Sequence, residues 1–201
     1  MDYSQNYINI SRDNLLDIVR SKVSQDRFDH ILRVEEMALK LARLYKQDLE
    51  AASVAALMHD MAKEMDGDFM YELAEAYTEN PKIKEGNPAI WHGPAAAQLA
   101  LNQYGLTDQT ILEAIACHTL GAPVSNTLAK IIYTADYVEA GRDFKGVDKA
   151  RQLVIDNLDE ACLYQMAETL KYLAKKRRKI YYESVETYNT WLDWMSSKED
   201  L

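Results

Sequence analysis

The chain has 201 residues, of which 48% are hydrophobic and 27% charged, the balance of a globular protein with a single domain. Its formal net charge of −9 excludes a basic module that binds nucleic-acid backbones. Cys117 and Cys162 are too few to build a disulfide framework or a cysteine-based zinc site.

The first residues of the chain, 1–6, are polar and acidic and lack the apolar segment of a secretory signal. The longest nearly apolar run, from Ala51 to Met58, is far shorter than the ~20 residues that span a bilayer. We therefore expect a cytoplasmic protein that binds neither membranes nor nucleic acid.

Helical periodicity runs through almost the whole chain. Ser11 and Ser24 are the expected caps of the first two helices, and the second helix reaches about Tyr45. A third, alanine-rich helix is predicted over about Asp48 to Lys63, and a fourth over Asp66 to Tyr77.

Residues 81–94 are predicted to be irregular, with Pro94 in the first turn of a helix that ends at Gly105. Later helices are expected to begin at Thr107 or Asp108, at Ser125 or Asn126, at Asp148 and at Asp159, the last reaching about Met195 with at most one break. No strand-like alternation exceeds four residues. The pattern predicts an all-α, globular helical bundle.

The four histidines fall in or beside apolar helices. His30 lies on the inward stripe of the second helix, and His59 follows the alanine-rich segment directly before Asp60. His92 is expected just before a helix start, and His118 in the last turn of a helix.

Asp136 adds a carboxylate within another apolar helix. One such group alone would indicate an ordinary hydrogen-bonded core residue. Six together point to a metal site, because buried imidazole and carboxylate groups are costly unless they are paired or bound to metal. The mixture suits Fe, Mn, Zn, Co or Ni better than Mg or Ca. Lys63, four residues after His59, is expected on the same face, where its charge could meet a phosphate oxygen.

The order His30, His59-Asp60, His92, His118, Asp136 resembles the HD-domain superfamily of all-helical, metal-dependent phosphohydrolases. Four segments more specifically resemble the YqeK family of symmetrical bis(5′-nucleosyl)-tetraphosphatases: 59–63 (HDMAK), 91–94 (WHGP), 114–121 (AIACHTLG) and 133–147 (YTADYVEAGRDFKGV). The resemblance covers about residues 24–175 of a single domain, 1–201, and leaves residues 176–201 as a helical extension.

The resemblance implies cleavage of diadenosine tetraphosphate into two ADP molecules at an iron-containing site. It implies that the primary metal ligands are His30, His59, Asp60 and Asp136. His92 and His118 then either hold a second metal or contact phosphate. The implied nucleotide-binding residues are His30, Lys63, His92, His118, Thr119, Gly121, Asp136 and Arg142.

The implied catalytic residues are Asp60, which helps the metal to position water, and Lys63, His92 and His118, which contact phosphoryl oxygens. Two segments depart from the family pattern. Residues 139–142 are Glu-Ala-Gly-Arg where the family tends to have Glu-Pro-Asn-Arg, a change that could shift Arg142. Leu120 replaces the small polar residue that is common after Thr119, which could alter base preference.

Several alternatives stay open at this point. The activity could be that of another HD-type nucleotide phosphohydrolase or phosphodiesterase, or the chain could be a non-catalytic nucleotide or metal sensor, or a purely structural helical protein. The metal could be Mn, Co or Zn in place of iron, as one ion or two. The expected partner is a small nucleotide, and the chain could form a homodimer.

Overall fold

A computed structural model describes residues 1–4 and 6–199 of the chain. The helices are α1 Arg12–Lys22, α2 Gln25–Leu44, α3 Leu49–Met58, α4 Gly67–Tyr77, α5 Pro88–Tyr104, α6 Gln109–Cys117, α7 Thr127–Val138, α8 Val147–Asp156, α9 Leu158–Lys175 and α10 Tyr182–Glu199, with a short 3-10 helix η1 at Pro81–Glu85. The described residues contain no strand, so the all-α expectation is confirmed. The last two residues of the predicted extension 176–201 lie outside the described part.

The helices begin where short polar side chains accept hydrogen bonds from the backbone amides of the first turn. Ser11, Ser24, Asp48 and Asp66 cap α1 to α4 in this way, as the sequence predicts. Gly105 ends α5 in the left-handed conformation, with φ of 66°.

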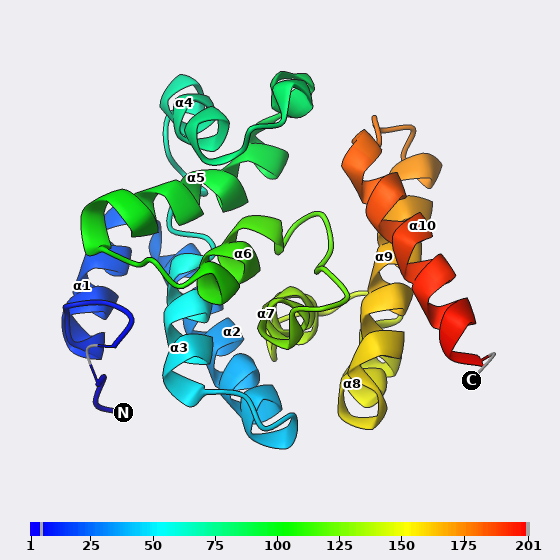
Figure 1. Ribbon diagram of the computed structural model, residues 1–201, viewed down its shortest axis with the longest axis horizontal. Helices are drawn as coiled ribbons and strands as arrows, with labels where there is room; N and C mark the ends of the chain where they lie inside the picture. Colours follow the sequence, from blue (N-terminus) through cyan, green and yellow to red (C-terminus); the bar gives the residue numbers. More distant parts are fainter. Residues whose placement is uncertain (5, 200–201) are drawn as a thin grey trace.

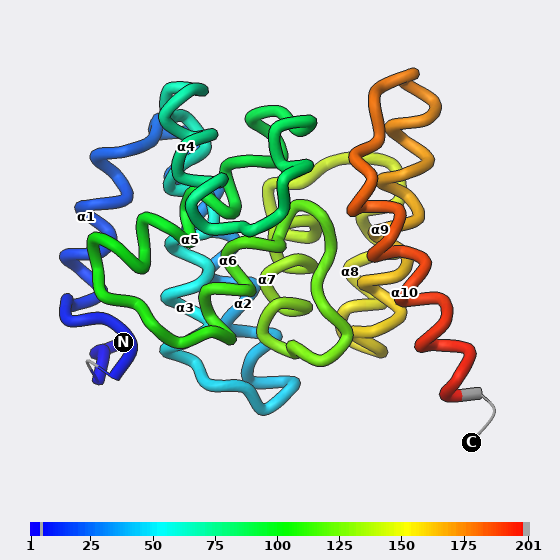
Figure 2. The backbone as a smooth tube through the Cα atoms, turned by 45° about the horizontal axis from the view of Figure 1, so that its top comes forward, coloured from blue at the N-terminus to red at the C-terminus, as the bar shows by residue number. Residues whose placement is uncertain are grey.

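α3 is the central helix of the bundle and packs against α1, α2, α5, α6 and α7. Every residue from Ala51 to Met58 is buried, and the small alanine side chains let neighbouring helices approach closely. In Figure 1, α3 lies between α1 on one side and α7 on the other. Figure 2 shows α8, α9 and α10 together at the end of the molecule opposite α1.

The predicted limits of two helices are wrong. α3 ends at Met58, not near Lys63, because the chain tightens there into turns closed by bonds such as Lys63 N to Asp60 O (2.9 Å). α5 begins at Pro88 with Asn87 as its cap, so Pro94 lies inside the helix and not in its first turn. His92 is consequently a helical residue.

Gly93 lets α5 and α6 approach each other closely beside His92. A Cβ atom on Gly93 would lie 2.5 Å from the carbonyl oxygen of Ala116, so any side chain at this position would clash with α6. This close approach brings the side chains of His92 and His118 within contact distance, with Nε2 atoms 2.8 Å apart.

The predicted long C-terminal helix is broken once, between α9 and α10. α10 returns along α9, and its buried Trp191 donates from Nε1 to the carbonyl oxygen of Ala122 (2.7 Å). Lys130 on α7 binds Asp159 on α9 (2.7 Å), which ties the same layer to the centre of the bundle. No helix among the described residues is long and apolar enough to cross a membrane.

We expect Trp191→Phe to lower the free energy of unfolding by about 1–3 kcal/mol, because a buried carbonyl oxygen loses its donor. Chemical denaturation followed by circular dichroism measures this change. Tyr172→Phe is the control, since Tyr172 is half exposed and its substitution should change stability by less than about 0.5 kcal/mol. Equal stability of the two variants would contradict the anchoring role of Trp191.

Candidate metal centre

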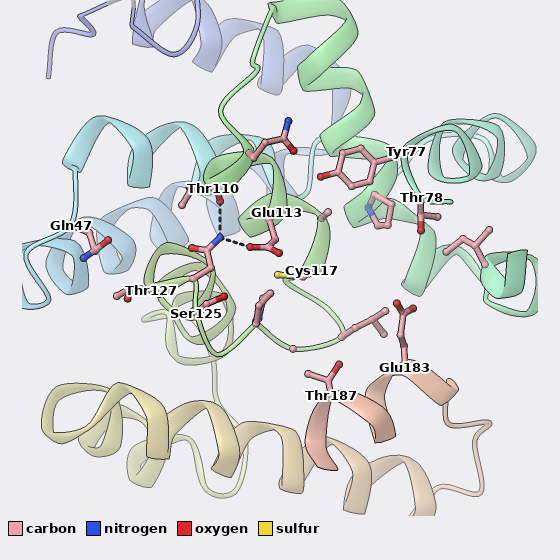
Figure 3. Close-up of a pocket in the computed structure, with 18 residues that line it drawn as sticks. Gln47, Tyr77, Thr78, Thr110, Glu113, Cys117, Ser125, Thr127, Glu183 and Thr187 are labelled. Carbon is pink, nitrogen blue, oxygen red and sulfur yellow. Dashed lines mark hydrogen bonds between the residues drawn. The ribbon is translucent and has the colours of Figure 1, made fainter. Parts of the chain in front are cut away.

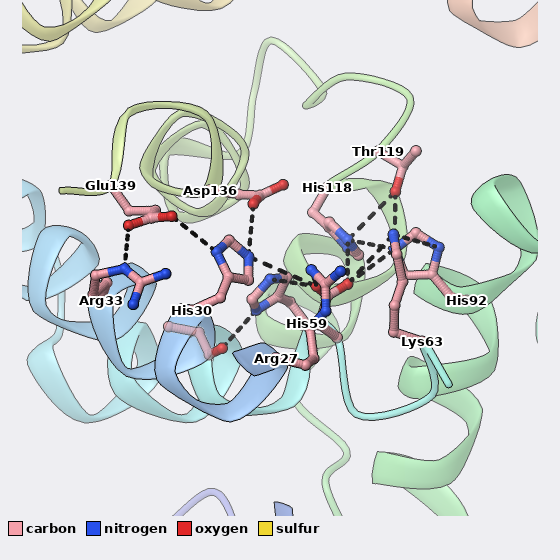
Figure 4. A network of polar contacts seen from close by, with 12 residues as sticks. Arg27, His30, Arg33, His59, Lys63, His92, His118, Thr119, Asp136 and Glu139 are labelled. Carbon is pink, nitrogen blue, oxygen red and sulfur yellow. Dashed lines mark hydrogen bonds and ion pairs between the residues drawn. The ribbon is translucent and has the colours of Figure 1, made fainter. Parts of the chain in front are cut away.

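Six imidazole and carboxylate side chains meet where α2, α3, α5, α6 and α7 come together (Figure 4). The set is His30 on α2, His59 and Asp60 at the end of α3, His92 on α5, His118 at the end of α6, and Asp136 on α7. The structure therefore gathers all six residues that the sequence singled out into one cluster.

Asp60 is the centre of this cluster. Its Oδ2 lies 3.5 Å from Nε2 of His59 and 3.7 Å from Nε2 of His30. Its Oδ1 lies 3.1 Å from Nε2 of His92 and 3.5 Å from Nε2 of His118. Asp136 completes the first side, with Oδ1 3.1 Å from Nε2 of His30. The two oxygens of Asp60 thus face two separate groups of imidazoles.

Adjacent residues at the end of α3 contribute to one site. His59 is the C-cap and keeps helical dihedral angles, with φ of −54° and ψ of −39°. The side chains of His59 and Asp60 therefore diverge by about 100°, and the cluster lies over the edge between them, where Nε2 of His59 is 3.5 Å from Oδ2 of Asp60.

Each of the four histidines is held in the same orientation by its Nδ1 atom. The Nδ1 atoms face oxygen acceptors: Glu139 Oε1 for His30 (3.1 Å), Ala56 O for His59 (2.6 Å), Pro88 O for His92 (3.1 Å) and Ile115 O for His118 (2.7 Å). A carbonyl or ionised carboxylate oxygen only accepts, so Nδ1 carries the proton and donates. The lone pair of every ring is then on Nε2 and points into the cluster.

Burial and neighbouring charges together keep three of these groups in the form that binds metal ions. Desolvation lowers the pKa of His59 and of His92 to about 4, so both rings are neutral at pH 7. Burial raises the pKa of Asp60, but the surrounding histidines and Lys63 outweigh it and hold this pKa well below its ordinary value. The cluster therefore combines the neutral imidazoles of His59 and His92 with the ionised carboxylate of Asp60.

The donor atoms fit a divalent transition metal. Nε2 of His30, Nε2 of His59 and Oδ1 of Asp60 are buried and have no hydrogen-bond partner among the described residues. Such orphaned polar atoms are costly unless an ion or a ligand satisfies them. His30, His59 and Asp60 offer atoms within 4.8 Å of one another, as do Asp60, His92 and His118. Nitrogen and oxygen donors of this kind suit Fe, Mn, Co or Zn.

Cationic side chains surround the cluster. Lys63 Nζ lies 3.0 Å from Nε2 of His92 and 3.7 Å from Oδ1 of Asp60, and burial lowers its pKa. Arg142 donates to the main-chain oxygen (2.9 Å) and to Oδ1 (2.5 Å) of Asp136. The change to Ala140-Gly141 has therefore left the Arg142 side chain beside the cluster.

Thr119 and Gly121, which the sequence placed together, lie on opposite faces of one turn. Thr119 Oγ1 is 3.3 Å from Nε2 of both His92 and His118. Gly121 lines a separate cavity of about 710 Å³, together with Leu120 and Glu113 (Figure 3). That cavity has no Lys, Arg or His in its lining, so its chemistry does not suit a polyphosphate.

Sequence reasoning missed two residues of the site. Arg27 donates from Nη1 to Oδ2 of Asp60 (2.8 Å), and Glu139 binds both His30 and Arg33. Arg27 lies three residues before His30 on the same helix, which is a spacing that could have identified it. Glu139 follows the apolar helix α7 directly, and only the tertiary structure reveals its contact with His30.

Comparisons with known proteins agree with this geometry. Residues 27–141 match the family model of the HD domain. The symmetrical bis(5′-nucleosyl)-tetraphosphatase of Bacillus subtilis is 33% identical over 91% of this chain and 98% of its own length. The protein of the same description from Staphylococcus aureus is 31% identical over 86% of this chain and 90% of its own.

A solved structure has the same fold. It comes from Clostridium acetobutylicum, is described as a predicted HD superfamily hydrolase involved in NAD metabolism, and is 35% identical, with a TM-score of 0.85 over 92% of this chain and 98% of its own. The span matched by the family model includes the positions of all six clustered histidines and aspartates. The chain therefore belongs to the HD-domain family of metal-dependent phosphohydrolases, in the group of the symmetrical bis(5′-nucleosyl)-tetraphosphatases.

Proposed function

We propose that the chain hydrolyses dinucleoside tetraphosphates symmetrically and converts diadenosine tetraphosphate into two ADP molecules. The observation that carries the proposal is the convergence of four Nε2 lone pairs on the carboxylate of Asp60, next to a cleft lined by arginines. The names and nearly full-length coverage of the bacterial relatives support the choice of substrate.

His30, His59, Asp60 and Asp136 are the proposed ligands of the primary metal, and iron is the metal we favour. His92 and His118 hold a second ion or contact phosphoryl oxygens. The position of Oδ1 of Asp60, 3.1 Å from Nε2 of His92 and 3.5 Å from Nε2 of His118, supports this division. When bound, the metal supplies Lewis-acid stabilisation of a phosphoryl oxygen and lowers the pKa of water near the reacting phosphorus.

The remaining roles fall to side chains around the cluster. Asp60 positions the water for attack on a central phosphorus atom, and Lys63, His92, His118 and Thr119 contact the phosphoryl oxygens. Arg142 binds a neighbouring phosphate through its planar, two-pronged guanidinium. The leaving group is a nucleoside diphosphate of low basicity, so it departs without a dedicated general acid. Gly121 shapes the turn that carries His118 and Thr119.

The proposed function extends to the domain organisation, the oligomeric state and the location of the protein. Residues 1–201 act as one domain, with 176–201 as a helical extension. A homodimer is supported by apolar side chains exposed on α9 and α10, namely Tyr172, Val185 and Leu192. A cytoplasmic location is supported by the free thiols of Cys117 and Cys162.

Removal of the metal should lower the melting temperature. A ligand present at about a thousand times its Kd stabilises a protein by about 4 kcal/mol, or about 8–16 °C at this chain length. Thermal unfolding with a chelator, and after reconstitution with Fe(II), Mn(II), Co(II) or Zn(II), measures the shift. His59→Gln should abolish the difference. Bound metal below about 0.1 per chain, with no shift for any of these ions, would contradict the site.

Symmetrical cleavage predicts ADP as the sole nucleotide product from diadenosine tetraphosphate, because attack falls on one of the two central phosphorus atoms. Chromatography of the products after incubation with each metal tests this. Equimolar ATP and AMP would refute symmetrical cleavage and would still leave a metal-dependent hydrolase.

Asp60→Asn tests the central carboxylate with little change in volume. We expect the fold to survive and turnover to fall by on the order of 10³ or more, because the amide oxygen is neutral and binds a divalent cation weakly. Activity, metal content and circular dichroism are measured on the same sample. Asp29→Asn, at an exposed site on α2, is the control and should retain full activity. A folded Asp60→Asn protein with more than about a tenth of the original turnover would remove Asp60 from the mechanism.

A further inference from the structure

A cleft of about 420 Å³ opens beside the metal cluster and is lined by Arg27, Arg33, Arg142 and His30, together with the acidic residues Asp26, Glu64 and Glu139. Two of these arginines are bound to cluster carboxylates, Arg27 to Asp60 and Arg142 to Asp136. Arg33 differs from them because it contacts none of the six cluster residues directly. The sequence pattern assigned it no role.

Arg33 presents free donors to this cleft. Its Nε donates to Oε2 of Glu139 (2.6 Å), whereas its two terminal nitrogens have no hydrogen-bond partner among the described residues. The side chain is 37% exposed. A guanidinium fixed through Nε, with both terminal nitrogens free, is oriented to bind phosphate through two bonds.

Gly141 provides the space that Arg33 occupies. A Cβ atom on Gly141 would lie 2.6 Å from Nε and 2.8 Å from Nη2 of Arg33. The amide of Gly141 also donates to Oε2 of Glu139, so the loop and the guanidinium share one carboxylate oxygen. The position of the Arg33 guanidinium therefore depends on the glycine at 141, where this chain departs from the Glu-Pro-Asn-Arg pattern.

Arg33 and Lys63 lie at opposite ends of the polar network, with His30 and His59 between them (Figure 4). Lys63 contacts the side of the cluster formed by His92. Arg33 lies one helical turn beyond His30, on the side of Glu139. A phosphate chain laid across the cluster would run between these two cations, and only a long chain would extend past His30 toward Arg33.

We propose that Arg33 binds the distal phosphates of a dinucleoside polyphosphate and selects long phosphate chains over short ones. The proposal rests on the proposed function, because it takes the reacting phosphate to lie at the metal cluster. Arg33 here is a substrate-binding residue that determines specificity. Its effect is confined to ligands whose phosphate chain extends past His30 toward Glu139.

The test compares two ligands by calorimetry on the metal-loaded protein. One is ADP, and the other is the diadenosine tetraphosphate analogue whose central bridging oxygen is replaced by CH₂, which is not cleaved. In Arg33→Gln, the Kd of the analogue should rise about tenfold or more, as expected for loss of a charged hydrogen bond, and the Kd of ADP less than about twofold. Equal changes for both ligands, or no change for either, would overturn the proposal.

Two further variants separate binding from folding. Gly141→Ala should displace the Arg33 guanidinium and raise the Kd of the analogue. Combining Gly141→Ala with Arg33→Gln should raise this Kd no further than Arg33→Gln alone, because both substitutions act on one contact. Arg43→Gln removes the same charge from an exposed position on α2 and should leave both affinities unchanged. Additive losses in the double variant would contradict the shared contact.

The two proposals fail in different ways. If the protein released no ADP from diadenosine tetraphosphate, the proposed reaction would be wrong, and calorimetry with the uncleaved analogue would still decide the role of Arg33. If Arg33→Gln bound both ligands as the unchanged protein does while ADP was still the sole product, only the role of Arg33 would be lost.

Discussion

The site depends on one constraint, which is that all four imidazoles donate through Nδ1 to fixed oxygen acceptors. Three of these acceptors are main-chain carbonyls, so the tautomer of each ring is set by the fold itself. The consequence is a concentration of Nε2 lone pairs that cannot satisfy one another. His92 and His118 show this crowding directly, since their Nε2 atoms lie 2.8 Å apart. A cation bound between the two rings would satisfy both lone pairs at once.

The alanine-rich helix α3 lets the helices that carry the ligand-type side chains pack closely around one point. Its small side chains allow five helices to pack around it, and four of these, α2, α5, α6 and α7, carry ligand-type side chains. The helix then ends at Met58, and its C-cap His59 keeps helical dihedral angles at the point where those helices meet. His59 and Asp60 therefore point about 100° apart, and the cluster lies over the edge between the two side chains.

Much of the fold was predictable from local signals in the sequence. Capping residues such as Ser24 and Asp48 and the apolar periodicity located most helix starts. The errors arose where tertiary packing overrides local preference. Pro94 was expected to begin a helix, but it lies inside α5, where Gly93 lets the backbone pack directly against α6. His92 lies in the cluster with Asp60 and His118, although its predicted local structure was wrong.

The candidate site was predictable only in part, and for a physical reason. Histidines and aspartates on apolar stripes stand out because burial without a partner is costly. Arginines at the rim carry no such signal, since a charged residue at the start of a helix is ordinarily solvated. The pairing of Glu139 with His30 joins segments more than a hundred residues apart. The contact of Arg27 with Asp60 depends on the course of the turn at residues 59–64. Sequence spacing places Arg27 on the same helix face as His30, but it contains neither the contact of Arg27 with Asp60 nor the pairing of Glu139 with His30.

The three arginines of the cleft differ in how they respond to charge in the cluster. Arg27 and Arg142 contact Oδ2 of Asp60 and Oδ1 of Asp136, the same oxygens that face Nε2 of His30. A cation bound there would compete with both guanidiniums for these oxygens, which would leave the two arginines freer to face phosphate. Arg33 is independent of this competition, because its partner Glu139 faces Nδ1 of His30 and not Nε2. The cleft therefore combines two cations whose positions depend on the cluster with one that the 139–141 loop holds in place.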